Sequence, residues 1–395
     1  MQIGMRMKEN RNQCSAKSTT KRKIKMKHNE VHTKGERYSI LNRPAIVCLF
    51  TAVVAWTLLV SAIGQQTWPP AGVAPNSPWT PTKSIDFSSK HNVLIKSDDG
   101  TLTPMDVPYY KTTLIAPGTW QILSDGDYAY LIEGDNEALA IDSTYGAGNI
   151  RQYMQTLTKK PLRYVANTHE HFDHTANNSY FDRAYMSAET QKHATIPYPS
   201  FTGITFPRDY PVQVIGDGYV FHLGNCDIEV FEIPNHTMGD LAFLDKRERL
   251  LFSGDVFLGN ITINANSSVA RFAANMRKLE ARRKDFDRLA GGPGVSDASY
   301  VDKLLANAEY ILAGHEGAPA TQPNGPRPAQ GQGAGQGQAP WQNTPSPGPN
   351  GEVVYNRKSV RPPDRAQPSN VSPENMRRMT YNDSTITYDI RHIKN

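Results

Sequence analysis

The residues with the clearest chemical potential in this sequence are three histidines within six consecutive positions, His169, His171 and His174. Two carboxylates, Glu170 and Asp173, lie between them. Neutral imidazole is the commonest protein ligand for borderline divalent ions, and a neighbouring carboxylate adds oxygen donors and offsets positive charge. The chain has 11 His among 395 residues, so this density is far above the average for the sequence. The cluster therefore predicts a metal site rather than a histidine-rich surface loop, with zinc as the expected ion.

The sequence around the cluster predicts how it is held. Residues 162–167 (LRYVAN) alternate apolar and polar side chains, which favours a strand that leads into the cluster. Positions two apart in an extended chain point to the same side, so His169 and His171 are expected to bind one ion together. After the chain turns, Asp173 and His174 are expected to face a second ion. Two-metal hydrolases hold their ions about 3.5 to 4 Å apart, which one such loop can span.

Two downstream segments carry residues of the same chemistry. His236 lies in a turn of Asn, Gly and Asp, within residues 234–240. The following run, 241–257, predicts a hairpin that turns at residues 245–249, so that Asp255 leaves the second strand. Each of these residues alone fits a structural role. Together with the first cluster they indicate further metal ligands, with the Asp255 carboxylate placed to bridge two ions.

The ordered set of motifs resembles the metallo-β-lactamase superfamily. The residues that carry the resemblance are His169-x-His171-x-Asp173-His174, His236 before Thr and Gly, Gly254-Asp255, and the earlier strand Leu139 to Asp142. The resemblance covers roughly residues 110 to 315. It implies an α/β (α+β) fold, a four-layer αββα sandwich with a two-metal site at one edge. In that family pattern, as in the glyoxalase II type, His169, His171 and His236 hold the first ion, Asp173 and His174 the second, and Asp255 bridges them.

The resemblance implies a zinc-dependent hydrolase that binds up to two zinc ions. Its metal-activated hydroxide would cleave an ester, thioester, lactone or β-lactam carbonyl, with Asp173 orienting the nucleophile. The di-iron redox branch has Glu where this chain has His171, so the zinc branch is favoured. True β-lactamases mostly use Cys at the position of Asp255, which argues against a dedicated lactamase. The alternative is a metal-poor relative that acts as a binding module.

The partner is expected to be a small molecule and not a nucleic acid. Nucleic-acid-processing members of the superfamily carry an additional domain before their last ligands. The segment between Asp255 and His315 is too short to contain one. The oligomeric state is not indicated.

Two segments compete for the family's last histidine ligand, which lies in a Gly-His-Gly-like loop just before a helix. Residues 313–317 (AGHEG) contain His315, but they follow the helical stretch 298–312. Residues 290–294 (AGGPG) precede that helix and have the better spacing from Asp255, but contain no histidine. The spacing favours the second segment, in which the ligand is lost at Gly292-Pro293.

The N-terminal part of the sequence predicts export of the domain. Residues 1–44 form a basic leader, and residues 45–64 are twenty positions without a charge. This apolar segment is expected to be either the core of a cleaved signal peptide, with small residues at 60–62, or a retained transmembrane anchor with its basic side in the cytoplasm. Either alternative places the catalytic domain outside the cytoplasm, secreted, periplasmic or membrane-anchored.

The remaining composition divides the chain into a linker, one domain and a tail. Residues 65–95 predict a linker and residues 96–317 the metallo-β-lactamase-like domain. Residues 318–351, rich in Pro, Gly and Gln, are expected to be disordered, while the end of segment 352–395 alternates in strand fashion and predicts an edge strand. Within the domain we expect strands in 112–132 and helices at 146–158, 173–181, 273–289 and 298–312. Cys226 is the only cysteine beyond the apolar segment, so no internal disulfide is expected there.

Overall fold

The computed structural model describes residues 85–125, 127–194, 204, 206–259, 261–263, 267–320, 346–357 and 373–394. The predicted leader and apolar segment lie outside the described residues, as does most of the Pro, Gly and Gln-rich stretch. Among the helices of the described ranges, none has the length and apolar character that crossing a bilayer requires.

A seven-stranded sheet forms the first half of the domain. Its strands follow the chain in order: β3 (Lys111–Ala116), β4 (Thr119–Ser124), β5 (Asp127–Glu133), β6 (Ala138–Ile141), β7 (Leu162–Ala166), β8 (Arg183–Met186) and β9 (Val212–Val214). The first four pair antiparallel, and β6 to β9 pair parallel. Every residue of β6 is buried, as expected for a strand covered on both faces.

A six-stranded sheet packs against the first one. Its strands are β10 (Val220–His222), β11 (Asp227–Glu232), β12 (Leu241–Asp245), β13 (Leu250–Phe252), β15 (Arg288–Ala290) and β16 (Ser296–Asp297). The hairpin of β12 and β13 confirms the turn predicted at 245–249. Side chains from both sheets, such as Tyr130 and Phe252, form a shared core between them.

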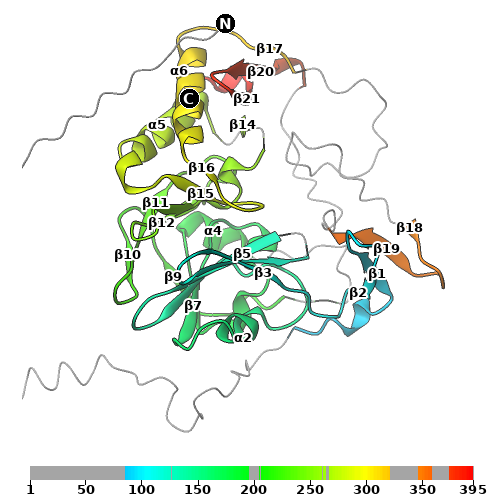
Figure 1. Cartoon of the computed structure of the whole chain (residues 1–395). Coiled ribbons are helices and arrows are strands. Elements are labelled where there is room, and N and C mark those ends of the chain that lie inside the picture. Colours follow the sequence, from blue (N-terminus) through cyan, green and yellow to red (C-terminus); the bar gives the residue numbers. More distant parts are fainter. Residues whose placement is uncertain are drawn as a thin grey trace, which may run out of the picture. The chain divides into compact units, whose positions relative to one another are not determined.

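Helices cover the outer face of each sheet. On the first sheet lie α2 (Ile150–Gln155), α3 (Phe172–Thr175) and α4 (Ala188–His193); on the second lie α5 (Val269–Glu280) and α6 (Ser299–Leu312). In Figure 1 the pair α5 and α6 lies above the second sheet and α2 below the first. Three cores therefore separate four layers, which confirms the predicted αββα sandwich.

Two helix predictions differ from the structure in extent. The helix expected at 273–289 ends at Glu280, because Leu289 pairs with Leu251 in the second sheet and its chain must be extended to do so. The helix expected at 173–181 is only the short α3, followed by a 3-10 turn. Asn178 begins that turn, and its side chain forms hydrogen bonds with the side chains of Asn167 and Ser143.

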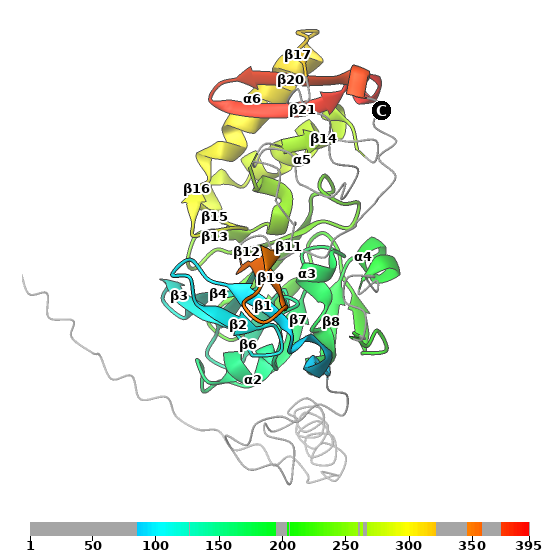
Figure 2. The same ribbon diagram turned by 90° about the vertical axis from the view of Figure 1, so that its right-hand side faces the viewer.

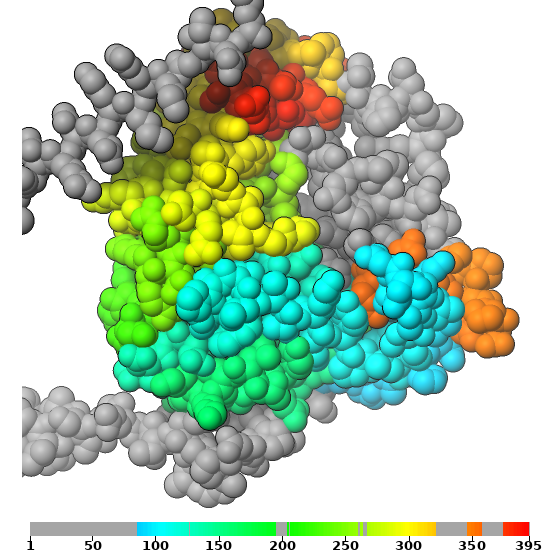
Figure 3. Space-filling model, viewed as in Figure 1, coloured from blue at the N-terminus to red at the C-terminus, as the bar shows by residue number. Residues whose placement is uncertain are grey.

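The domain begins earlier than residue 96. Ile85 and Phe87 are buried in the core of the first sheet, within the stretch predicted to be a linker. A small sheet follows, in the order β18 (Ser346–Pro347), β19 (Val353–Asn356), β1 (Val93–Lys96) and β2 (Leu102–Pro104). Figure 3 shows residues 346–357, in orange, against the cyan N-terminal strands. The boundary at residue 96 was wrong, because the apolar residues before it pack into the domain.

The C-terminal residues also belong to the domain. The hairpin of β20 (Met376–Tyr381) and β21 (Ser384–Asp389) joins β14 (Ile261–Ile263) and β17 (Ala318–Pro319) in a fourth sheet that packs on α6. Figure 2 shows this hairpin lying across α6. The predicted strand is thus present, but it pairs on both sides and is not an edge strand.

Candidate metal centre

One edge of the sandwich collects the functional side chains, because several segments begin or end there. Antiparallel pairing of Tyr130 with Ile141 brings the start of β5 beside the end of β6, and β7 ends at the same edge because it is parallel to β6. In the second sheet, the antiparallel strands β11, β12 and β13 bring the loop 233–240 and the exit of β13 together. The backbone N–H of Leu241 donates to the carbonyl of Thr168 at 2.7 Å, which joins the two edges.

A first group of donors consists of His169, His171, His236 and Asp255, each with one ligand atom within 4.8 Å of the others. His236 Nε2 lies 2.9 Å from His171 Nδ1 and 3.6 Å from Asp255 Oδ2. These are four of the six predicted metal ligands, drawn from segments up to 86 residues apart in sequence. The structure therefore brings together the set predicted for the first ion.

A second group consists of Asp127, His174 and Asp255, and it shares Asp255 with the first. His174 Nε2 lies 3.4 Å from Asp127 Oδ2 and 3.4 Å from Asp255 Oδ1. The two oxygens of Asp255 thus point to different groups, Oδ2 to the first and Oδ1 to the second. If both groups bound a cation, Asp255 would therefore offer one oxygen to each of them.

Asp142 fixes the orientation of the His174 ring. It follows β6 in a left-handed backbone conformation (φ 59°), which Asp adopts more readily than most non-glycine residues. Its Oδ2 accepts hydrogen bonds from His174 Nδ1 and from the Thr168 hydroxyl, both at 2.8 Å, and its Oδ1 accepts from the Thr168 N–H. Because an ionised carboxylate only accepts, Nδ1 carries a proton and Nε2 faces the second group.

The charges around His174 favour a cation. Burial opposes protonation of the ring, but the carboxylates of Asp127, Asp142 and Asp255 outweigh it and hold the pKa of His174 well above its usual value. In the absence of a metal, a proton on His174 therefore offsets part of the negative charge of these buried carboxylates. A cation bound at Nε2 displaces that proton, so occupancy is expected to be linked to pH.

Asp240 shapes the loop that carries His236. Its carboxylate accepts hydrogen bonds from the backbone N–H groups of Asn235 and Thr237, at 3.0 and 2.9 Å, and from the Thr237 hydroxyl at 2.8 Å. Burial raises the pKa of Asp240 to about 6, against the effect of His236 and of these hydrogen bonds. The turn is thereby closed around one buried acid, which sets the direction of the imidazole.

The donor sets fit a divalent ion. A zinc ion bound at about 2.0 to 2.1 Å places neighbouring tetrahedral donors about 3.4 Å apart, which matches the two separations from His174 Nε2. That nitrogen is buried, with the His174 side chain 2% exposed, and it makes no hydrogen bond to any described residue. Imidazole and carboxylate donors suit zinc and other first-row divalent ions.

Comparison with known families agrees with this geometry. The model of the metallo-beta-lactamase superfamily matches residues 125–315, which contain both donor groups and both central sheets. Residues 125–315 belong to the metallo-β-lactamase superfamily. The predicted membership is confirmed.

Individual relatives of the superfamily match only part of the chain. A human acyl-coenzyme A thioesterase, MBLAC2, is 26% identical over 160 residues, covering 32% of this chain and 57% of the relative. A hydroxyacylglutathione hydrolase of Pelagibacter ubique is 28% identical over 134 residues, covering 33% of this chain and 50% of the relative. The chain thus spans about half the length of these curated relatives. The FIM-1 metallo-β-lactamase of Pseudomonas aeruginosa, solved in a mono-zinc form, is 17% identical, with a TM-score of 0.40, covering 53% of this chain and 98% of that one.

The structure decides between the two candidates for the superfamily's last histidine. His315 is exposed beyond the end of α6, where its ring stacks on Tyr310 with centroids 3.7 Å apart, and it belongs to neither donor group. The loop 291–294 instead lies beside the site: a Cβ on Gly291 would meet the Gly254 carbonyl oxygen at 2.2 Å. The loop next to the metal centre therefore carries no histidine, and the family match merely extends to residue 315.

Asp173 is the predicted ligand that the structure leaves outside both groups. It lies half-buried in the first turn of α3, between the ligands His171 and His174. Its role as a ligand of the second ion and as the catalytic residue stays a prediction.

Asp127 is the donor that sequence reasoning missed. It occupies the first position of β5 and is separated from the histidine cluster by more than forty residues. The sequence offers only a carboxylate at the start of a strand-like run; the pairing of this strand with β6, which Asp142 follows, is seen only in the structure. His193 and His222 lie outside both groups. Cys226 is buried, and burial raises the pKa of its thiol to about 12.

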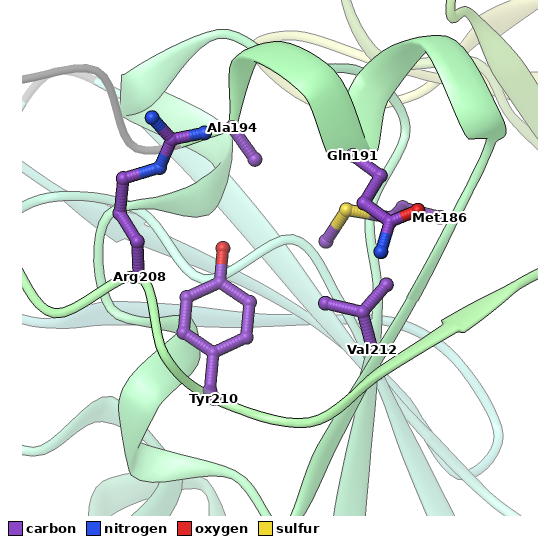
Figure 4. A pocket seen from close by; sticks show the side chains of 6 residues that line it. All are labelled: Met186, Gln191, Ala194, Arg208, Tyr210 and Val212. Atoms are coloured by element: carbon purple, nitrogen blue, oxygen red, sulfur yellow. The ribbon is translucent and has the colours of Figure 1, made fainter.

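A separate cavity of about 240 Å³ lies beside α4. Figure 4 shows Arg208 and Tyr210 on one side of it, facing Met186, Gln191 and Val212. Its lining includes no residue of either donor group. This cavity is therefore separate from the candidate metal centre.

Proposed function

We propose that this protein is a zinc-dependent hydrolase of acyl compounds, with thioesters as the preferred class. The observation that carries the proposal is the sharing of Asp255 between two donor groups, one rich in imidazole and one rich in carboxylate. That arrangement supports two cations a few ångströms apart. When bound, such cations polarise a carbonyl and lower the pKa of water from near 16 toward roughly 7.

The residues of the chain supply the remaining chemistry. Asp255 and the three imidazoles of the first group are held by two sheets and one bridging hydrogen bond, so little reorganisation is needed when substrate binds. Asp173 lies between the ligands His171 and His174 in sequence and is half-buried, so solvent can reach it, which suits it to accept a proton from an attacking water and to orient that water.

The rim of the site supports an acyl substrate with a charged carrier. Met238, two residues after His236, is 39% exposed and offers apolar surface for an acyl chain. Arg271 Nη1 lies 3.5 Å from its sulfur, so a cation borders the same surface. The names of two relatives, an acyl-coenzyme A thioesterase and a hydroxyacylglutathione hydrolase, support the same class of substrate.

The proposal is tested by turnover of the full-length protein loaded with Zn²⁺. We expect release of free thiol from a panel of acyl-coenzyme A and acyl-glutathione thioesters, with lactone and β-lactam substrates as comparison arms. Replacing Asp255 by Ala is expected to lower kcat/KM by at least about 1000-fold, because both donor groups lose a ligand. His222→Ala, an exposed histidine outside the site, is the matched control. Absence of hydrolysis from every arm by a protein that holds two zinc ions would refute the proposal.

The second candidate function, a metal-poor binding module, is favoured by the loop 291–294, which supplies no histidine. Metal content separates the two. Near two equivalents of zinc per chain supports the enzyme, and under half an equivalent supports the binding module.

We also propose that the domain is exported through residues 45–64. Protease protection in intact cells tests this: the domain should be digested from outside or recovered in the external fraction. A domain that is recovered intact with the cytoplasm would contradict it.

A further inference from the structure

We propose that Asp127 is a metal ligand of the second donor group, in the place of the histidine that the loop 291–294 does not supply. The inference deepens the proposed function, since it rests on that metal site. Asp127 lies at the start of β5, and its side chain is 9% exposed.

The position of Asp127 is that of a ligand. Its Oδ2 lies 3.4 Å from His174 Nε2, the same distance that separates this nitrogen from Asp255 Oδ1. The three ligand atoms come from three segments and lie within 4.8 Å of one another, and both separations from His174 Nε2 match the spacing of about 3.4 Å that tetrahedral zinc imposes. His174 Nε2 is buried, is oriented into this group by Asp142, and makes no hydrogen bond to any described residue.

Leu258 packs against the loop beside the site. A Cβ on Gly292 would lie 2.1 Å from Leu258 Cδ2, so the Leu258 side chain would have to move before a histidine at position 292 could be accommodated. Gln121 fixes the loop in this conformation: its Nε2 donates to the Gly292 carbonyl at 2.7 Å, and its Oε1 accepts from the Gly294 N–H at 3.1 Å. The second group is therefore completed from β5 and not from the loop.

A carboxylate in place of a histidine changes which metal ions the second donor group prefers. Two carboxylates and one imidazole surround it, whereas three imidazoles and one carboxylate surround the first. Oxygen donors favour harder cations, so the second position is expected to accept Mn²⁺ more readily than the first.

The test is the metal stoichiometry and affinity of the full-length protein, measured with Zn²⁺ against a chromophoric chelator. The wild type is expected to bind two equivalents. Asp127→Asn keeps the shape of the side chain but removes its charge, and should retain the first equivalent while losing affinity for the second. Loss of an outer-shell partner alone typically costs about 10- to 100-fold in metal affinity, so loss of a direct ligand should cost at least about 100-fold.

Two further variants sharpen the result. His315→Ala is expected to bind both equivalents with unchanged affinity, because His315 is exposed and outside the site. Adding Gly292→His and Leu258→Ala to the Asp127→Asn protein is expected to restore part of the second affinity by opening the loop to an imidazole. Unfolding of the metal-free proteins by urea shows whether each variant is folded.

The inference is overturned if Asp127→Asn binds two equivalents within threefold of the wild-type affinities, or if the wild type binds only one. Should Asp127→Asn not fold, anomalous diffraction from the zinc-loaded wild type decides: Asp127 must lie within about 2.2 Å of the second ion. These results are independent of turnover. Hydrolysis by a protein whose Asp127 does not bind metal would leave the proposed function intact, and a protein that binds no zinc at the first group would refute the proposed function itself.

Discussion

Replacing Asp142 by Asn probes the support of the metal centre without touching a ligand. The carboxylate accepts three hydrogen bonds at 2.8 Å, two from Thr168 and one from His174 Nδ1. An amide has one acceptor oxygen, so the substituted side chain must present N–H groups to a donor on one side. If the NH₂ faces Thr168 N–H, a buried backbone donor loses its partner. If it faces His174, the ring must shift its proton to Nε2, the atom that faces the second group.

The magnitude follows from these two outcomes. A buried donor left unsatisfied costs about 1 to 3 kcal/mol, so we expect the free energy of unfolding of the metal-free protein to fall by about 2 kcal/mol. In the metal-bound protein the wrong tautomer must be reversed before His174 can bind, and the affinity for the second ion should fall about 10- to 100-fold. The first ion, held without His174, should bind as before.

Urea unfolding and a Zn²⁺ titration against a chelator measure both quantities. The matched control is Asp227→Asn: Asp227 makes the same contact to a histidine, His222 Nδ1 at 2.8 Å, but both side chains are more than half exposed. It should change stability by less than about 0.5 kcal/mol. An Asp142→Asn protein with wild-type stability and wild-type affinity for both ions would refute the reasoning.

Three other substitutions test the architecture around the site. Arg357→Ala leaves Asp125 buried without its cation, 2.5 Å away, and should cost about 3 kcal/mol at pH 8 in urea unfolding. Burial raises the pKa of Asp125 to about 6 although Arg357 lowers it, so removing Arg357 should raise this pKa further. The carboxyl of the variant then takes up its proton above the wild-type pKa, and the cost should shrink as pH falls from 8 toward about 6; a cost that is constant from pH 5 to 8 would contradict this. Gly291→Ala places a Cβ 2.2 Å from the carbonyl oxygen of Gly254. It should lower the free energy of unfolding by about 1 to 3 kcal/mol and weaken zinc binding. Unchanged thermal unfolding and zinc affinity would show that the loop does not contact the site closely. Asn307→Ala removes the buried amide that donates to Met379 and Ser384 carbonyls of the C-terminal hairpin; we expect about 2 kcal/mol of destabilisation and faster exchange of the hairpin amides, and unaltered exchange would contradict a role in holding it.

The sequence by itself determined the first metal position. His169 and His171 follow β7, which ends at Ala166, and their residue types and close spacing predicted a shared set of ligands, which the structure brings together. His236 and Asp255, the other two members of this group, could also be predicted, because the residues around them are typical of short turns. The four-layer architecture was predicted from the resemblance to the metallo-β-lactamase superfamily, and it is confirmed.

Only the tertiary structure showed which residues form the second donor group and where the domain begins and ends. Asp127 becomes a donor only because the antiparallel pairing of β5 with β6 brings its carboxylate to His174, and no spacing along the chain encodes that pairing. His315 has the sequence context of a ligand, yet the length of α6 carries it away from the metal centre. Ile85 and the C-terminal hairpin joined the core for the same reason: apolar side chains pack where the folded surface offers a partner, and that surface exists only once the sheets have formed.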